Sequence, residues 1–210
     1  MWDLQRPLLP DAVSVEYPGH GEAPLTAVDG IGGLARQVLD EVPGRFSFIG
    51  LSLGAAVGVY LAAEHPERVE KLVLACTSAR FGEPSQWRER AAAVRKDGPA
   101  VIVDAVMARW FTPAFQDVDR YREMFLSVDA EGYARCCEAL AEWDGSSFLG
   151  RIDAPTLVIA GALDPTSPPE HGREIAGRVP GARFAVIADA AHLANVEAAA
   201  TFNELLEEHL

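Results

Sequence analysis

The stretch FIGLSLGAAVGVYLAAEHP, Phe48–Pro66, places a serine between two glycines where an apolar run meets an alanine-rich run. The first run is typical of a buried strand and the second of a helix. A strand that turns directly into a helix makes a sharp turn, with small residues on both sides of its apex. Gly50 and Gly54 meet that need. The stretch predicts a parallel α/β sheet, with Ser52 either a nucleophile or a small residue in a tight turn.

The helix expected after Ser52 favours the nucleophile over the tight-turn interpretation. The first N–H groups of a helix have no intrahelical acceptor, and this end of the helix carries a partial positive charge. The N–H of Leu53 is therefore a candidate donor to an oxyanion. Glycine and serine are common residues, so the G-x-S-x-G pattern alone is weak and its position between strand and helix decides.

The rest of the chain repeats the alternation of strand and helix, which predicts an α/β fold with a mostly parallel sheet flanked by helices. The expected strands are residues 12–17, 46–50, 69–76, 155–161 and 182–188, and the expected helices outside the central region are 25–42, 53–64, 168–179 and 193–210. From 80 to 150 the spacing is helical throughout, without a strand. We expect residues 1–79 and 151–210 to form the core and 80–150 a helical cap insertion.

The composition excludes several classes of function. The 31 acidic and 18 basic residues give a formal charge of −13, which repels nucleic acid and anionic membranes. The opening MWDLQRPLLPDAV has no basic patch followed by an apolar run, and no apolar stretch is long enough to span a bilayer. We expect a cytoplasmic protein with no nucleic-acid or membrane partner. Cys76, Cys136 and Cys137 form neither a zinc pattern nor a disulfide framework and are expected to be buried thiols.

A serine nucleophile needs a histidine to accept its proton and a carboxylate to orient that histidine. Asp164 follows the expected strand 155–161, and His192 follows the expected strand 182–188. Each alone has an ordinary alternative, a turn before proline for Asp164 and a helix cap or core-edge position for His192. Together with Ser52 they follow three strands at one edge of a parallel sheet, in the chain order Ser, Asp, His.

The alternative acid and bases fit this arrangement less well. Asp189 lies three residues before His192 on the same loop, so we rank it below Asp164. The other histidines lie in expected helices, in the tail or in the loop YPGHGEAP; they are His65, His171, His209 and His20.

Several motifs resemble those of the α/β-hydrolase superfamily, and the resemblance covers essentially the whole chain. They are GHG at 19–21, GLSLG at 50–54, GALDPTSPP at 161–169 and AAHLANVE at 190–197. More narrowly, RWFTPAF at 109–115 and GYARCCEALAEWD at 132–144 resemble the 3-oxoadipate enol-lactonase family of bacterial aromatic-acid degradation, the β-ketoadipate pathway.

The resemblance implies that Ser52 attacks the lactone carbonyl, His192 accepts its proton and Asp164 orients the imidazole, without a metal or an organic cofactor. Two alternatives stay open: a related carboxylesterase, and a non-catalytic binding protein of the same fold. The implied substrate carries a carboxylate, so a cation of the cap should receive it. Arg109 is the candidate, with Trp110 and Trp143 as pocket walls; the ordinary alternative is a solvated arginine and two core tryptophans.

The chain departs from the superfamily at its N-terminus. Members carry additional strands there and a loop with HG or a similar motif, which supplies the second oxyanion donor. Here MWDLQRPLLP resembles the helix that follows that loop. In the family's sheet order, one of these strands lies between the strands expected at 12–17 and 46–50. We expect either that the native protein starts upstream of Met1 or that a short form pairs its strands differently, and we favour the first.

Overall fold

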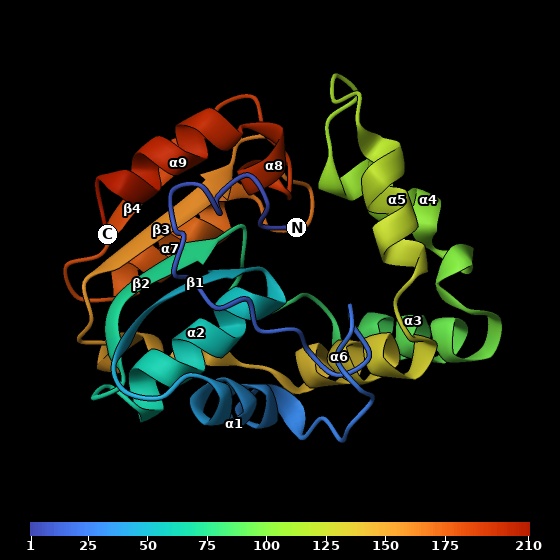
Figure 1. Ribbon diagram of the computed structural model, residues 1–210, viewed down its shortest axis with the longest axis horizontal. Coiled ribbons are helices and arrows are strands. Elements are labelled where there is room, and N and C mark those ends of the chain that lie inside the picture. Colours follow the sequence, from blue (N-terminus) through green and yellow to red (C-terminus); the bar gives the residue numbers. More distant parts are fainter.

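The computed structural model describes residues 1–210 and has a four-stranded parallel sheet flanked by helices (Figure 1). The strands are β1 (Phe46–Leu51), β2 (Val69–Ala75), β3 (Thr156–Gly161) and β4 (Arg183–Ile187). They pair in the order β1-β2-β3-β4, and all three pairings are parallel. The α/β fold class predicted from the sequence is confirmed.

Alternate side chains of the strands divide the core between the two faces of the sheet. Leu72 and Leu74 of β2 pack in one cluster and Val73 and Ala75 in the other, as the two-residue period of a strand requires. The first cluster contains residues of α1 (Gly30–Glu41), α2 (Leu53–Glu64) and α7 (Pro169–Arg178), and the second contains residues of α8 (Ala194–Glu197) and α9 (Ala199–Glu207). Because both faces are covered, residues 72–75 of β2 and 157–160 of β3 are continuous apolar runs.

The segment expected to be a strand at 12–17 is not one. It forms no ladder with β1, whose only partner is β2, and it leaves Val13 62% exposed. A strand is stable only beside a hydrogen-bonded neighbour, and in the family's order another strand would lie between this segment and β1. Without a strand in that position, residues 12–17 run as irregular chain and β1 is an edge of the sheet.

Two of the expected helices have different bounds. The first begins at Gly30 rather than at residue 25, because Gly30 has a positive φ of 59° that the preceding chain uses to turn into the helix. The last is divided at Ala198, whose φ of −128° and ψ of 50° are not helical. After this break, Phe202 and Leu206 of α9 are fully buried in the second core cluster.

The region between β2 and β3 contains helices and no strand, and Figure 1 shows it to one side of the sheet. The helices are α3 (Pro84–Asp97), α4 (Val103–Trp110), α5 (Val118–Leu126) and α6 (Ala130–Glu142), with short 3-10 turns at Pro99–Val101, Gly145–Ser147 and Leu149–Arg151. The chain leaves and re-enters the core at one place, where the Gly145 N–H donates to the Ala79 carbonyl at 2.8 Å and Arg80 pairs with Asp144. This is the geometry of an insertion; the division at 80 and 150 stays a prediction.

The three cysteines are free and buried, as expected. Burial raises the pKa of each thiol to about 12, so all three are protonated at neutral pH. No helix combines the length and the apolar character that crossing a bilayer requires.

Candidate active site

Ser52 occupies the turn between β1 and α2 with a backbone conformation that L residues rarely adopt. Its φ is 53° and its ψ is −113°, and only one other non-glycine residue of the chain, Cys76, has a positive φ. Such strained conformations cost about 1–3 kcal/mol and are concentrated at functional sites. Ser52 is half-buried at the end of the strand, and its side chain makes no hydrogen bond. The turn thus presents a hydroxyl that no structural contact uses.

The two glycines beside Ser52 differ in their importance for the turn. A Cβ on Gly50 would lie 2.3 Å from the Gly54 carbonyl oxygen, an impossible approach to backbone. A Cβ on Gly54 would meet only the Tyr17 hydroxyl, at an ordinary 3.7 Å. The expectation that both positions demand a small residue is therefore wrong for Gly54, because the chain passes close to Gly50 alone.

Gly50→Ala is expected to destabilise the fold and Gly54→Ala to be tolerated. The Gly50 substitution forces strand and helix apart, an overpacking that costs about 3 kcal/mol or roughly 10 °C in Tm for a chain of this size. The Gly54 substitution adds a methyl group at ordinary contact distance from the Tyr17 hydroxyl and raises helix propensity by up to about 1 kcal/mol. Thermal unfolding of the two variants tests this pair. Equal Tm values would contradict the close approach at Gly50.

Asp164 and His192 form a buried hydrogen-bonded pair. The Asp164 Oδ2 to His192 Nδ1 distance is 2.7 Å, and the two residues are 3% and 4% exposed. Asp164 Oδ1 accepts the N–H groups of Thr166 (2.8 Å) and Ser167 (3.1 Å). A carboxylate oxygen accepts, so Nδ1 is the ring nitrogen that donates to Asp164 and Nε2 is left outside this contact. This is the orientation that a general base requires.

Gly161, the last residue of β3, allows the two loops that carry this pair to meet. A Cβ at Gly161 would lie 2.2 Å from the Ala191 carbonyl oxygen. The Leu163 N–H also donates to the Ala190 carbonyl at 3.0 Å. The loop after β3 and the loop after β4 are therefore joined through their backbones, which sets the separation of Asp164 and His192.

The alternative residues do not enter this arrangement. Asp189 is exposed and makes no side-chain hydrogen bond. His171 contacts the Ser78 hydroxyl at 2.6 Å, and His20 Nδ1 lies 3.1 Å from the Pro18 carbonyl oxygen. Burial also lowers the pKa of His20. His65 caps the end of α2, and His209 lies in the terminal turn.

The end of β2 brings Ser52 toward the loop that follows β4 and carries His192, which we call the histidine loop. The Ser52 N–H donates to the Ala75 carbonyl and the Thr77 hydroxyl donates to the Ser52 carbonyl, at 2.9 and 3.0 Å. Cys76, between Ala75 and Thr77, contacts the histidine loop: its Sγ lies 4.0 Å from the Ala191 carbonyl oxygen. No hydrogen bond joins Ser52 Oγ to His192. Catalytic hydrogen bonds are often long in ligand-free enzymes and tighten when substrate binds.

Leu53, predicted as an oxyanion donor, is the first residue of α2. Its N–H has no intrahelical acceptor and makes no hydrogen bond elsewhere in the chain. The group is therefore available to a ligand that reaches Ser52. The structure assigns no second donor beside it.

The three residues proposed to bind substrate from the cap lie in different surroundings. Arg109 is exposed and forms no ion pair. Trp110 packs edge-on against Phe125 beside the second core cluster, next to the histidine loop. Trp143 stacks on Phe148 at 5.4 Å beside the first cluster, on the other face of the sheet from Trp110. The Trp143 ring also lies close to Gly145, and its role as a pocket wall stays a prediction.

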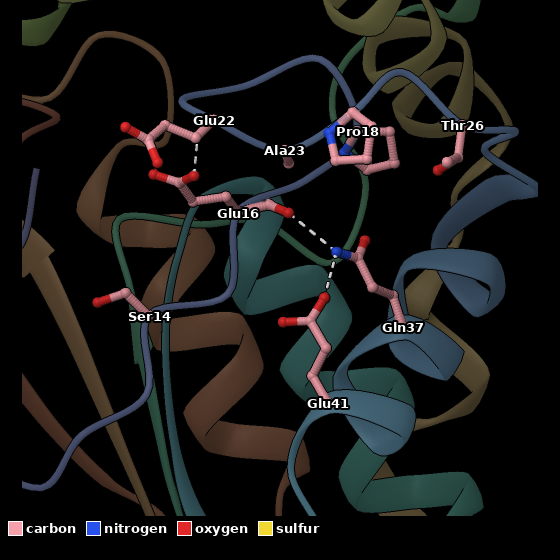
Figure 2. Close-up of a pocket in the computed structure, with 9 residues that line it drawn as sticks. Ser14, Glu16, Pro18, Glu22, Ala23, Thr26, Gln37 and Glu41 are labelled. Atoms are coloured by element: carbon pink, nitrogen blue, oxygen red, sulfur yellow. Dashed lines mark hydrogen bonds between the residues drawn. The ribbon is translucent and has the colours of Figure 1, made fainter.

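Two hollows of the structure include neither Ser52 nor His192 in their lining. One, of about 480 Å³, lies between the N-terminal segment and α1 and carries the carboxylates Glu16, Glu22 and Glu41 (Figure 2). Gln37 spans it, donating to the Glu16 carbonyl and the Glu41 carboxylate. The other, of about 390 Å³, is lined by Ser78, Arg80 and His171 among others. The acidic hollow would repel a substrate that carries a carboxylate.

Sequence reasoning missed one residue that contacts the histidine loop, Glu197. It closes the motif AAHLANVE, but neither its spacing nor its type distinguishes it from a surface glutamate of the last helix. Its contacts become visible only in the folded chain.

Comparison with known proteins gives a consistent result. A family model described as alpha/beta hydrolase fold matches residues 42–199. The chain is 34% identical to 3-oxoadipate enol-lactonase 2 of Acinetobacter baylyi, over 99% of this chain and 82% of the relative. It is 30% identical to a pimeloyl-[acyl-carrier protein] methyl ester esterase of Neisseria meningitidis, over 99% and 88%. The crystal structure of the enol-lactonase from Burkholderia xenovorans LB400 matches with a TM-score of 0.92 and 34% identity, covering 99% of this chain and 84% of that one.

Proposed function

Because the chain belongs to the α/β-hydrolase family, we propose that it is a serine hydrolase that opens 3-oxoadipate enol-lactone to 3-oxoadipate, a step of aromatic-acid catabolism. The coarser statement, that it is a carboxylic-ester hydrolase, follows from the family together with its lactonase and esterase relatives. One observation supports the serine-hydrolase mechanism most directly. The buried Asp164–His192 pair lies at the end of the sheet where the strained turn presents Ser52.

The proposed reaction has two stages. Ser52 Oγ attacks the lactone carbonyl while His192 Nε2 takes the hydroxyl proton, and the Leu53 N–H stabilises the negative charge on the carbonyl oxygen. Cleavage of the ring C–O bond leaves an acyl-enzyme whose enol oxygen receives the proton from His192 and tautomerises to a ketone. Water, deprotonated by His192, then attacks the ester carbonyl. The bond between the acyl carbon and Ser52 Oγ breaks, His192 returns its proton to Oγ, and the second carboxyl group of the product is released.

The lactone is favoured over a neutral ester by two relatives. Both the Acinetobacter baylyi protein and the Burkholderia xenovorans structure carry the name enol-lactonase and align over 99% of this chain. Arg109, exposed and free of ion pairs, remains our candidate for the substrate carboxylate, with Trp110 beside it. A hydrolase of neutral esters is the second candidate, because the Neisseria meningitidis esterase also aligns over 99% of the chain.

Parallel kinetics on two substrates test the proposal. The 210-residue chain is assayed on 3-oxoadipate enol-lactone and on a neutral aryl ester, and Ser52 is labelled with a fluorophosphonate probe and located by peptide mass spectrometry. We expect the higher kcat/KM on the lactone and labelling at Ser52. A higher value on the ester would select the second candidate. Absence of both turnover and labelling would indicate a binding protein of the same fold.

A further inference from the structure

The loop that carries His192 is tied to the cap on both sides of the histidine. The N–H of Leu193, the next residue, donates to the Trp110 carbonyl at 3.0 Å. The N–H of Ala191, the preceding residue, donates to Glu197 Oε2 at 2.8 Å. Both neighbours are buried, so neither amide has water as a substitute acceptor.

Glu197, which accepts the Ala191 N–H, also accepts hydrogen bonds from the cap. Its Oε1 accepts the Thr112 N–H at 2.9 Å and also the Thr112 hydroxyl. One carboxylate therefore bridges Ala191 to Thr112, which lies two residues after Trp110 at the end of α4. We call residues 110–112 the cap anchor. The two amides that flank His192 thus both connect to the cap anchor, one directly and one through Glu197.

We propose that Glu197 is a positioning residue, whose carboxylate bridge between the cap anchor and Ala191 holds the His192 ring in place for the reaction. The proposal rests on the role of His192 under the proposed function. The Asp164 bond holds the ring at Nδ1, and the position of the ring also depends on where the backbone of His192 lies. The hydrogen bonds of the Ala191 and Leu193 amides hold that backbone on both sides of His192. A displacement of about 1 Å at a reacting group can cost about 100-fold in rate.

The bridge requires a carboxylate, which makes Glu197→Gln informative. Both oxygens of Glu197 accept from N–H or O–H groups, so an amide can satisfy one side only. The amide NH2 group then faces another donor, and that side of the bridge opens. Glu204→Gln, at an exposed residue of α9 with no partner, is the matched control for the lost charge.

We expect Glu197→Gln to lower kcat and the rate of fluorophosphonate labelling of Ser52 by about tenfold to hundredfold, with KM little changed, while Glu204→Gln behaves as the wild type. Thr112→Val removes the hydroxyl and keeps the amide contact, so we expect a smaller fall in the same direction. In ¹⁵N-histidine-labelled protein, Glu197→Gln should move the ring resonances of His192 and leave the other four histidines unchanged.

Unchanged His192 resonances in Glu197→Gln, or rates equal to those of Glu204→Gln, would overturn the proposal. A fall in Tm with an unchanged rate per folded molecule would also overturn it, since it would make the bridge purely structural. If the wild type hydrolyses neither the lactone nor the ester, the proposed function fails, while the His192 resonances still decide whether Glu197 positions the ring. Thr112→Val supplies the same readouts if Glu197→Gln does not fold.

Discussion

Replacing Ser52 by alanine is expected to lower the turnover number about 10⁶-fold, the loss measured when a serine nucleophile is removed from another hydrolase. No other hydroxyl takes its place, because the strained turn presents Ser52 alone at this point, and the neighbouring Thr77 hydroxyl is used to hold the Ser52 carbonyl. The fold should be unaffected, since the Ser52 side chain makes no hydrogen bond.

Steady-state hydrolysis of the lactone and the aryl ester, with thermal unfolding alongside, measures this effect. Ser47→Ala is the matched control: the same substitution at an exposed position of β1, five residues earlier in the chain. It should retain wild-type turnover. Turnover by Ser52→Ala at the level of Ser47→Ala would refute the nucleophile assignment and with it the proposed mechanism.

Replacing Asp164 by asparagine is expected to lower kcat about 10⁴-fold, the size of the effect for the equivalent change in a serine protease. With its Oδ1 still accepting the Thr166 and Ser167 N–H groups, the asparagine turns its NH2 group toward His192 Nδ1. Two donors then face each other, and the proton of the ring moves to Nε2. In that tautomer His192 cannot accept the proton of Ser52.

The rival acid provides the control for this prediction. Asp189→Asn removes an exposed carboxylate from the same loop as His192 and makes the same chemical change. Its kcat should equal that of the wild type. A large loss in Asp189→Asn together with a small loss in Asp164→Asn would reverse the assignment of the acid.

The strand and helix pattern was sufficient to choose Ser52, Asp164 and His192 as candidates. In a parallel sheet the C-terminal ends of all strands lie at one edge, so residues that follow different strands can be placed together without knowing any side-chain position. Local spacing also predicted the helical region between β2 and β3 and the runs that form β1 to β4.

The errors have a common cause, since each concerns a contact between distant segments. Residues 12–17 have the alternation of a strand, yet no strand lies beside them to accept their hydrogen bonds. Gly54 fits the turn pattern, yet only Gly50 meets backbone at close range.

By itself, the sequence determined the fold class, the order of the elements and the three candidate catalytic positions, because these depend on local periodicity and on residues adjacent to strand ends. Only the tertiary structure decided that Asp164 rather than Asp189 meets His192, and that Glu197 connects the histidine loop to the cap anchor. Such pairings depend on the packing of segments far apart in the chain, where a shift of a few ångströms makes or breaks a hydrogen bond without changing any local pattern.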